Sequence, residues 1–269
     1  SNLFLACGMT MVIILGGIDL SVGSIIALSG CFAAGCVSRY GLPIAVGVLG
    51  GVLVGTVVGM FNGVVISKTT IPPFIVTLAT MNVAKGLAYV YTGGSPVRVV
   101  TKEWQFLGAG YVGGVPTPVI LLAVVLVITA IIMNKTKLGR HIYAVGGNRQ
   151  SALMLGVDVK RTRFLSHLFC GLLAGIGGYV YFLHVGSGSA SHAMGMEMNA
   201  IASSIIGGTL LTGGVGNIFG TFVGVLSLST IQNIVSSIGL DQAWWTGITV
   251  AAMLCLFLVI QSVILARKR

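Results

Sequence analysis

The side chains of this sequence that could do chemistry are ionisable groups inside or beside long apolar runs. The carboxylates are Asp19, Glu103, Asp158, Glu197 and Asp241. Such groups are costly in lipid and are usually retained for function. Asp19 and Glu197 each precede an apolar run, so each is expected to act as a helix N-cap, with a place on a permeation path as the alternative. Lys85 lies within an apolar run, where it could bind a substrate or instead pair internally or extend its ammonium to water.

Two glycine-rich segments interrupt the apolar sequence in similar ways. They read Gly16-Gly17-Ile18-Asp19-Leu20-Ser21-Val22-Gly23 and Gly207-Gly208-Thr209-Leu210-Leu211-Thr212-Gly213-Gly214. Aligned on their Gly-Gly pairs, they also share a leucine and the final glycine, which suggests a parallel internal repeat of a kind used by transporters. Because glycine permits sharp turns, we expect helix breaks that face the protein core. The candidate break and pathway residues are Gly16, Gly17, Asp19, Ser21, Gly23, Lys85, Glu197, Asn199, Gly207 and Gly208.

The segment from residue 134 to residue 163 is unusually basic. It holds Lys135, Lys137, Arg140, Arg149, Lys160, Arg161 and Arg163, and the positive-inside rule makes it cytoplasmic. Within it, residues 146–148 predict a turn and cap, Gln150 to Leu155 predict a short helix, and Gly156 ends that helix. A solvated loop would leave the apolar residues 152–155 unexplained, so we favour a docking element. Its candidate coupling residues are Gly139, Arg140, Gly146, Gly147, Asn148, Ala152 and Gly156.

The sequence carries no motif for hydrolysis. It contains none of HExxH, GxSxG or GxxxxGK[ST], and its histidines lack the spacing of metal ligands. The five cysteines form no CxxC pair and lie in apolar runs, where cysteine serves as a small core residue. We therefore expect no catalytic residue, no metal site and no cofactor in this chain.

The composition is that of a polytopic membrane protein. Hydrophobic residues make up 55% of the chain, charged residues make up 7%, and the mean hydropathy is +1.02. The net charge of +10 does not indicate nucleic-acid binding, because the basic residues stand at the ends of apolar runs. We predict an all-α membrane helix bundle with broken helices, one domain over residues 1–269. Its nine expected spans are 3–15, 20–38, 43–66, 73–92, 117–133, 164–183, 196–211, 217–236 and 243–264.

The basic residues also orient these spans. If the 134–163 segment is cytoplasmic, alternation places Lys68 and the C-terminus, with Arg267, Lys268 and Arg269, inside as well. The loops 92–116 and 184–195 then face outside. The aromatic residues on that side are Trp104, Phe106, Tyr111, Trp244 and Trp245.

Glycine also recurs at a spacing that favours helix packing. Gly47, Gly51, Gly55, Gly59 and Gly63 are four residues apart, so they share one helix face. Small residues at this spacing let membrane helices approach closely. We expect a packing seam, with a substrate-lining groove as the alternative.

Over essentially all of its 269 residues, the sequence resembles the membrane permease subunits of bacterial ABC sugar importers. The resemblance rests on Gly8-Met9-Thr10, the 16–24 segment, Gly94-Ser95-Pro96, the loop from Leu138 to Gly156, and the segment from Ala200 to Gly214. The family serves ribose, xylose, arabinose, galactoside and galactofuranose uptake, and the 207–216 run with Trp244-Trp245 is most similar to the galactofuranose branch. Two features depart from the family pattern. Its members usually have a further N-terminal helix, ten in all, and commonly an aspartate in place of Asn199.

The resemblance implies a multi-pass protein of the bacterial inner membrane that imports a monosaccharide. Its partners would be a second permease subunit, in a homo- or heterodimer, two ABC ATPase subunits that bind ATP and Mg²⁺, and a periplasmic sugar-binding protein that meets the outer loops. Closure of the ATPases on ATP would pull on the docking element and open the pathway. An ion-coupled secondary transporter, working without partners, is the main alternative, and a passive channel is the other.

Overall fold

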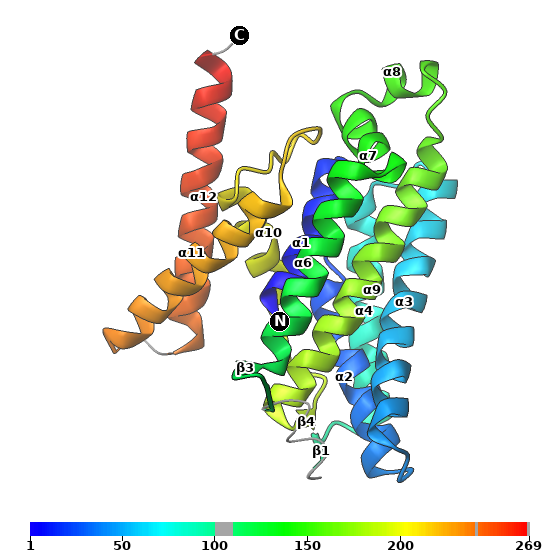
Figure 1. Cartoon of the computed structure of the whole chain (residues 1–269), viewed down its shortest axis with the longest axis vertical. Coiled ribbons are helices and arrows are strands. Elements are labelled where there is room, and N and C mark those ends of the chain that lie inside the picture. Colours follow the sequence, from blue (N-terminus) through cyan, green and yellow to red (C-terminus); the bar gives the residue numbers. More distant parts are fainter. Residues whose placement is uncertain (100–109, 240–241, 268–269) are drawn as a thin grey trace.

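The computed structural model describes residues 1–99, 110–239 and 242–267 as a bundle of helices (Figure 1). In chain order the elements are α1 (Asn2–Ile14), α2 (Val22–Ser38), α3 (Ile44–Lys68), α4 (Pro73–Thr92), β1 (Val97–Arg98), β2 (Tyr111–Val112), β3 (Val115–Pro116), α6 (Thr117–Lys135), α7 (Lys137–Gly147), α8 (Arg149–Met154), α9 (Val159–Val185), β4 (Ser187–Gly188), α10 (Met196–Ile206), α11 (Ile218–Ser237) and α12 (Ala243–Arg267). The short strands form two antiparallel pairs, β1 with β4 and β2 with β3.

Each of the nine predicted spans contains a helix, but nine complete crossings are not confirmed. Among the described residues, six helices are long and apolar enough to cross a membrane: α3, α4, α6, α9, α11 and α12. Helices α1 and α2 are apolar but shorter. Helix α10 has 11 residues, which at 1.5 Å per residue gives a length of only about 17 Å. The fold is therefore a polytopic membrane bundle that includes part-length helices.

Proline and glycine set several of the helix ends. Pro43, Pro72 and Pro116 stand immediately before α3, α4 and α6. Proline is tolerated at a helix start, because its fixed φ suits the chain there and the N–H that it lacks would have no partner within the helix. Gly93 and Gly186 adopt left-handed conformations with φ of 65° and 69° at the ends of α4 and α9. Such glycines stop a helix without steric strain.

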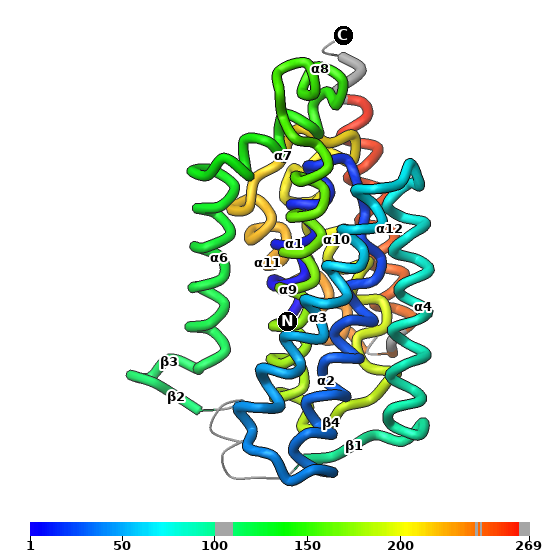
Figure 2. The backbone as a smooth tube through the Cα atoms, turned by 90° about the vertical axis from the view of Figure 1, so that its right-hand side faces the viewer, coloured from blue at the N-terminus to red at the C-terminus, as the bar shows by residue number. Residues whose placement is uncertain are grey.

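Helix α1 is the centre of the bundle. All of its residues from Leu3 to Ile14 are buried, and α6, α7, α9, α10 and α11 pack around it. A helix that is apolar on every side can be surrounded either by other helices or by lipid, and α1 is surrounded by other helices. The helix begins part-way along the bundle in both views (Figures 1 and 2) and ends at the end of the bundle that carries α7 and α8. We refer to this end as the α8 end.

The glycine seam of α3 is a packing surface. All five glycines are buried, and they face the backbones of α2 and α9. A Cβ atom built at Gly55 would lie 2.6 Å from Cα of Gly175, and one at Gly59 would lie 2.7 Å from Cα of Gly171. Because the seam is closed by backbone atoms, the alternative of a substrate-lining groove is wrong.

The segments that were predicted to lie on opposite sides of the membrane are found at opposite ends of the bundle. The turn between α3 and α4, helices α7 and α8, and the C-terminal end of α12 lie at the α8 end, whereas β3 and the start of α12 lie toward the other end (Figure 1), and β2 lies beside β3 (Figure 2). Tyr111, Trp244 and Trp245 belong to that second end and are exposed. The predicted residues Glu103, Trp104, Phe106, Asp241, Lys268 and Arg269 lie outside the described part of the chain.

Candidate functional site

The two glycine-rich segments end α1 and α10 in the same way. Gly16 and Gly208 both have φ of +88°. In each segment the N–H of this glycine donates to the carbonyl three residues before it, and the next N–H donates to a carbonyl five residues back, at 2.8 to 3.0 Å. This pair of bonds is the Schellman motif. Gly16 therefore corresponds to Gly208, one residue further on than an alignment of the Gly-Gly pairs indicates.

The two breaks are in direct contact. The N–H of Gly214 donates to the carbonyl of Ile14 at 2.8 Å, and a Cβ atom built at Gly213 would lie 3.1 Å from Cα of Gly16. The repeat is thus parallel, with both helix ends at the α8 end. Gly16 and Gly208 are exposed there, so the expectation that the breaks face the core is wrong for these two glycines.

Helix α7 packs onto this contact. A Cβ atom at Gly146 would overlap the carbonyl oxygen of Ile14, and one at Gly214 would lie 2.7 Å from Cα of Gly147. We name Ile14, Gly146, Gly147, Gly213 and Gly214 the glycine junction. It brings the predicted coupling segment against both helix breaks.

Tyr143 adds a polar contact beside the glycine junction. Its hydroxyl donates to the carbonyl of Gly216 at 2.8 Å. Burial raises the pKa of Tyr143 above its ordinary value, so the hydroxyl keeps its proton and remains a donor. Helix α7 is therefore attached to the second break by a hydrogen bond as well as by close packing.

The sequence analysis missed α7 and treated its residues as part of a loop. The helix begins after Thr136, whose hydroxyl accepts from the N–H of Gly139 at 3.3 Å. A Cβ atom at Gly139 would overlap the carbonyl oxygen of Met133, so glycine permits the tight corner after α6. Ile142 and Val145 are buried on one face, a spacing that could have revealed the helix. Arg140 is on the exposed side.

Helix α8 follows closely on α7 and largely matches the predicted short helix. Asn148 lies between the two helices, and its side chain accepts from the N–H of Ser151 at 2.9 Å. Gly156, with φ of +78°, follows the end of α8. Ala152 is only 2% exposed, whereas Leu153, Met154 and Leu155 are 53%, 82% and 80% exposed. The helix thus buries one small residue and presents three large apolar ones.

Asp19 is not the N-cap of α2, because that helix begins after Ser21. The Asp19 side chain is fully buried, and its Oδ1 accepts from the N–H of Ser21 at 3.0 Å and from its hydroxyl at 2.6 Å. This is the local turn that aspartate forms with the residue two positions on. Asn62 donates to the Ser21 hydroxyl at 2.9 Å, and Thr80 donates to Asn62 at 2.7 Å. The network fixes the first break to α3 and α4.

Gly23, Lys85 and Glu197 line one small cavity of about 160 Å³, between α2, α4 and the start of α10. A Cβ atom at Gly23 would overlap the Glu197 carboxylate, so glycine makes room for it. The N-cap of α10 is Gly195, so Glu197 lies in the first turn and the N-cap prediction for it is wrong. The sequence analysis did not place the three other polar lining residues, Ser24, Asn82 and His192, at this site.

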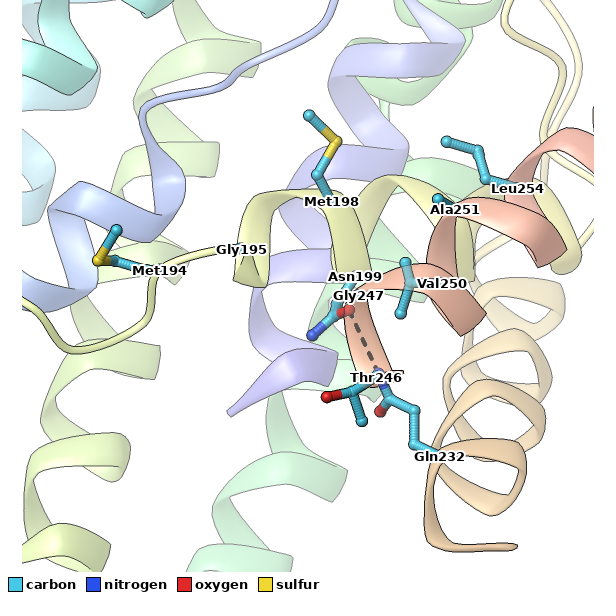
Figure 3. A pocket seen from close by; sticks show the side chains of 10 residues that line it. All are labelled: Met194, Gly195, Met198, Asn199, Gln232, Thr246, Gly247, Val250, Ala251 and Leu254. Carbon is cyan, nitrogen blue, oxygen red and sulfur yellow. Dashed lines mark hydrogen bonds between the residues drawn. The ribbon is translucent and has the colours of Figure 1, made fainter. Parts of the chain in front are cut away.

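Asn199 lines a different cavity, of about 390 Å³, together with Gln232 of α11 and Thr246 of α12 (Figure 3). The Nε2 group of Gln232 donates to Oδ1 of Asn199 at 3.4 Å. Met194 and Gly195 line both cavities. The sequence analysis did not single out Gln232 or Thr246, although an amide within an apolar run is a signal for a functional residue. Gly207 lies elsewhere, packed against the carbonyl of Gly220.

A polytopic helical bundle with paired helix breaks, and with partly open cavities that include polar side chains in their lining, is typical of a membrane transport protein. The chain belongs to the family described as the branched-chain amino acid transport system / permease component, whose model matches residues 2–258. Membership of this family makes it a permease component of a multi-pass membrane transport system.

Three relatives illustrate the similarity. The chain is 38% identical to the ribose import permease protein of Bacillus subtilis over 90% of this chain and 75% of the relative. It is 35% identical to an inner membrane ABC transporter permease protein of Escherichia coli over 96% and 79%. It is 34% identical to the fructose import permease protein of Bifidobacterium longum over 98% and 80%. No solved structure gave a significant match.

Proposed function

We propose that this chain forms the translocation pathway for a monosaccharide in an ATP-driven importer. The names of its ribose and fructose relatives support a sugar as the substrate. The observation that carries the proposal is the glycine junction, because it joins a helix pair outside the spans to both broken helices. The proposed partners are two ATPase subunits that bind ATP and Mg²⁺, a second permease subunit and an extracytoplasmic sugar-binding protein. We propose no cofactor in this chain.

The proposed mechanism transmits movement from α8 to the cavities. An ATPase subunit would dock on the exposed apolar residues of α8, and Asn148 joins α8 directly to α7. Helix α7 touches Ile14 and Gly214, so a shift of α7 displaces both breaks together. Helix α10 has only 11 residues, and its first turn borders both cavities. Displacing one of its ends therefore moves the cavity walls at the other, as in other hinge and shear transitions.

Uptake measurements on the complete importer test this proposal. With the ATPase and binding protein present in proteoliposomes, we expect uptake of D-ribose or D-fructose that requires ATP, and no uptake of L-leucine. Uptake driven by an ion gradient without the ATPase would instead support an ion-coupled transporter, and flux without either energy source would support a channel. Uptake of L-leucine alone would contradict the sugar assignment.

The orientation of the chain gives a further prediction. Because the α8 end carries the basic segment, we propose that it is cytoplasmic, with the C-terminus on the same side. In a cysteine-free background, a cysteine at Tyr111 should react with an impermeant maleimide on intact spheroplasts, and a cysteine at Gln150 should react only after lysis. Both positions are exposed. The reverse labelling pattern would invert the topology and remove the proposed ATPase site.

A further inference from the structure

The cavity in Figure 3 has two chemically different walls. It lies between the start of α10 and helices α11 and α12, and its volume of about 390 Å³ is within the usual range for small-molecule sites. Asn199, Gln232 and Thr246 form the polar wall. The apolar wall consists of Met194, Met198, Val250, Ala251 and Leu254.

The polar wall suits a neutral molecule with several hydroxyl groups. Among the described residues that line the cavity, none is charged. The amides of Asn199 and Gln232 each offer both donors and acceptors, which match hydroxyl groups that also do both. A zwitterionic amino acid would leave its ammonium and carboxylate without ionic partners, which is costly in a low-dielectric site. The apolar wall offers contact to the C–H surface of a sugar ring.

The hydrogen bond between the side-chain amides of Gln232 and Asn199 is weak enough to be replaced by hydrogen bonds to a ligand. Its length of 3.4 Å lies beyond the usual 2.7 to 3.2 Å range, so the two groups are close enough to share one ligand hydroxyl but are not tightly satisfied by each other. Figure 3 shows the two side chains turned toward each other. Uncharged polar groups placed this way in membrane helices usually serve function.

The backbone beside the cavity is strained. Ala193 has φ of +59° and Gly195 has φ of +82°, and Ala193 is the only residue other than glycine with a positive φ in the described part of the chain. A residue with a Cβ atom adopts this conformation at a cost, and such strain gathers at functional sites. Met194 stands between these two residues in the chain and lines both the amide-lined cavity and the cavity of Lys85 and Glu197.

We propose that the cavity of Asn199, Gln232 and Thr246 is a subsite for an uncharged monosaccharide on the translocation pathway, with the two amides as its hydrogen-bonding pair. The assignment rests on the proposed function of sugar import, and it adds the residues that contact the sugar. It also separates this cavity from the charged one, to which Lys85 and Glu197 belong.

Filling the cavity tests the assignment with a matched control. A Cβ atom built at Gly247, which lines the cavity, meets nothing within 4 Å, and the same is true at Gly86 of α4. Gly247→Leu therefore adds bulk to the cavity, whereas Gly86→Leu adds the same bulk away from it. In the complete importer we expect Gly247→Leu to lower ATP-driven D-ribose uptake by at least about tenfold, and Gly86→Leu to retain uptake within about twofold. Copurification of the ATPase shows that each variant assembles.

A second pair of variants removes the polar contact without adding bulk. Gln232→Ala should lose the saturation-transfer NMR signal of D-ribose on the purified permease–ATPase complex, and Asn233→Ala, one residue along α11 and exposed, should keep it. If the parent importer takes up D-ribose and both Gly247→Leu and Gln232→Ala behave like it, the subsite is wrong and the proposed function stands. If the parent takes up neither sugar, the proposed function itself fails. Blocked L-leucine uptake in Gly247→Leu would overturn the assignment to a sugar.

Discussion

Gly146→Ala is expected to uncouple ATP hydrolysis from uptake, whereas Gly147→Ala should leave transport nearly unchanged. A Cβ atom at Gly146 would overlap the carbonyl oxygen of Ile14 and would lie 2.7 Å from the N atom of Gly214. Both are backbone atoms, which cannot move aside as a flexible side chain can. A Cβ atom at Gly147 meets nothing within 4 Å. The two substitutions are chemically identical and differ only in what they touch.

The expected size of the effect follows from the contact that is lost. The alanine methyl separates the N–H of Gly214 from the carbonyl of Ile14, a bond of 2.8 Å, and overpacking of this kind costs about 1–3 kcal/mol. A change of that size in the coupling between two sites corresponds to about a 5- to 150-fold change in their linkage. The measurement is sugar-stimulated ATP hydrolysis and uptake by the purified importer. Equal behaviour of the two variants in assembled complexes would show that the glycine junction does not transmit the signal.

Helix positions could be predicted where the apolar sequence and the helix coincide. Pro73 begins α4 and Gly93 follows its end, so the span 73–92, predicted from its apolar length, has the same bounds as the helix. Helix α9 was predicted to begin five residues too late, because its first residues include Lys160, Arg161 and Arg163 and precede the apolar run. Asp158 caps the first turn of α9 by accepting from the N–H of Arg161 at 2.9 Å. A hydropathy pattern does not detect a charged helical turn, whereas a capping residue in the sequence indicates where the helix begins.

The repeat could be recognised from the sequence but not placed exactly. Matching the Gly-Gly pairs aligned Gly16 with Gly207, yet Gly207 has φ of −71° and still belongs to the end of its helix. The structural equivalent of Gly16 is the glycine with positive φ, Gly208. The aligned glycines Gly16 and Gly207 therefore have different backbone conformations, and the hydrogen-bond pattern identifies the glycines that are equivalent in structure.

The grouping of the site residues could not be predicted, because it depends on contacts between distant segments. Gly146 and Ile14 meet through the packing of α7 onto α1, and no periodicity in either segment specifies the other. Asn199 and Glu197 are two residues apart in one short helix, so they point to different sides and line different cavities. Asp19 had the residue type of a cap, but its bond to Ser21 places it in the turn before the helix.

The exposed face of α8 carries the second large expected effect. Leu153, Met154 and Leu155 are all more than half exposed, and the helix lies outside the apolar spans. Large apolar side chains gathered on a water-facing surface mark a protein interface. Ala152, which the sequence suggested as a docking residue, is buried. A charged substitution there would disturb the packing of α8 itself, so it would not isolate the docking surface.

Met154→Asp combined with Leu155→Asp is therefore expected to abolish copurification of the ATPase while the permease still inserts. The two exposed side chains have room for aspartate in the isolated chain, but at an interface each would bury an unpaired carboxylate, and loss of one such central contact can cost 2 kcal/mol or more. The matched control is Tyr111→Asp combined with Val112→Asp, which places the same two charges on exposed neighbouring residues at the opposite end of the bundle. The control should retain the ATPase. If the α8 double variant retained it too, the ATPase would have to dock elsewhere, and the glycine junction would lose its proposed source of movement.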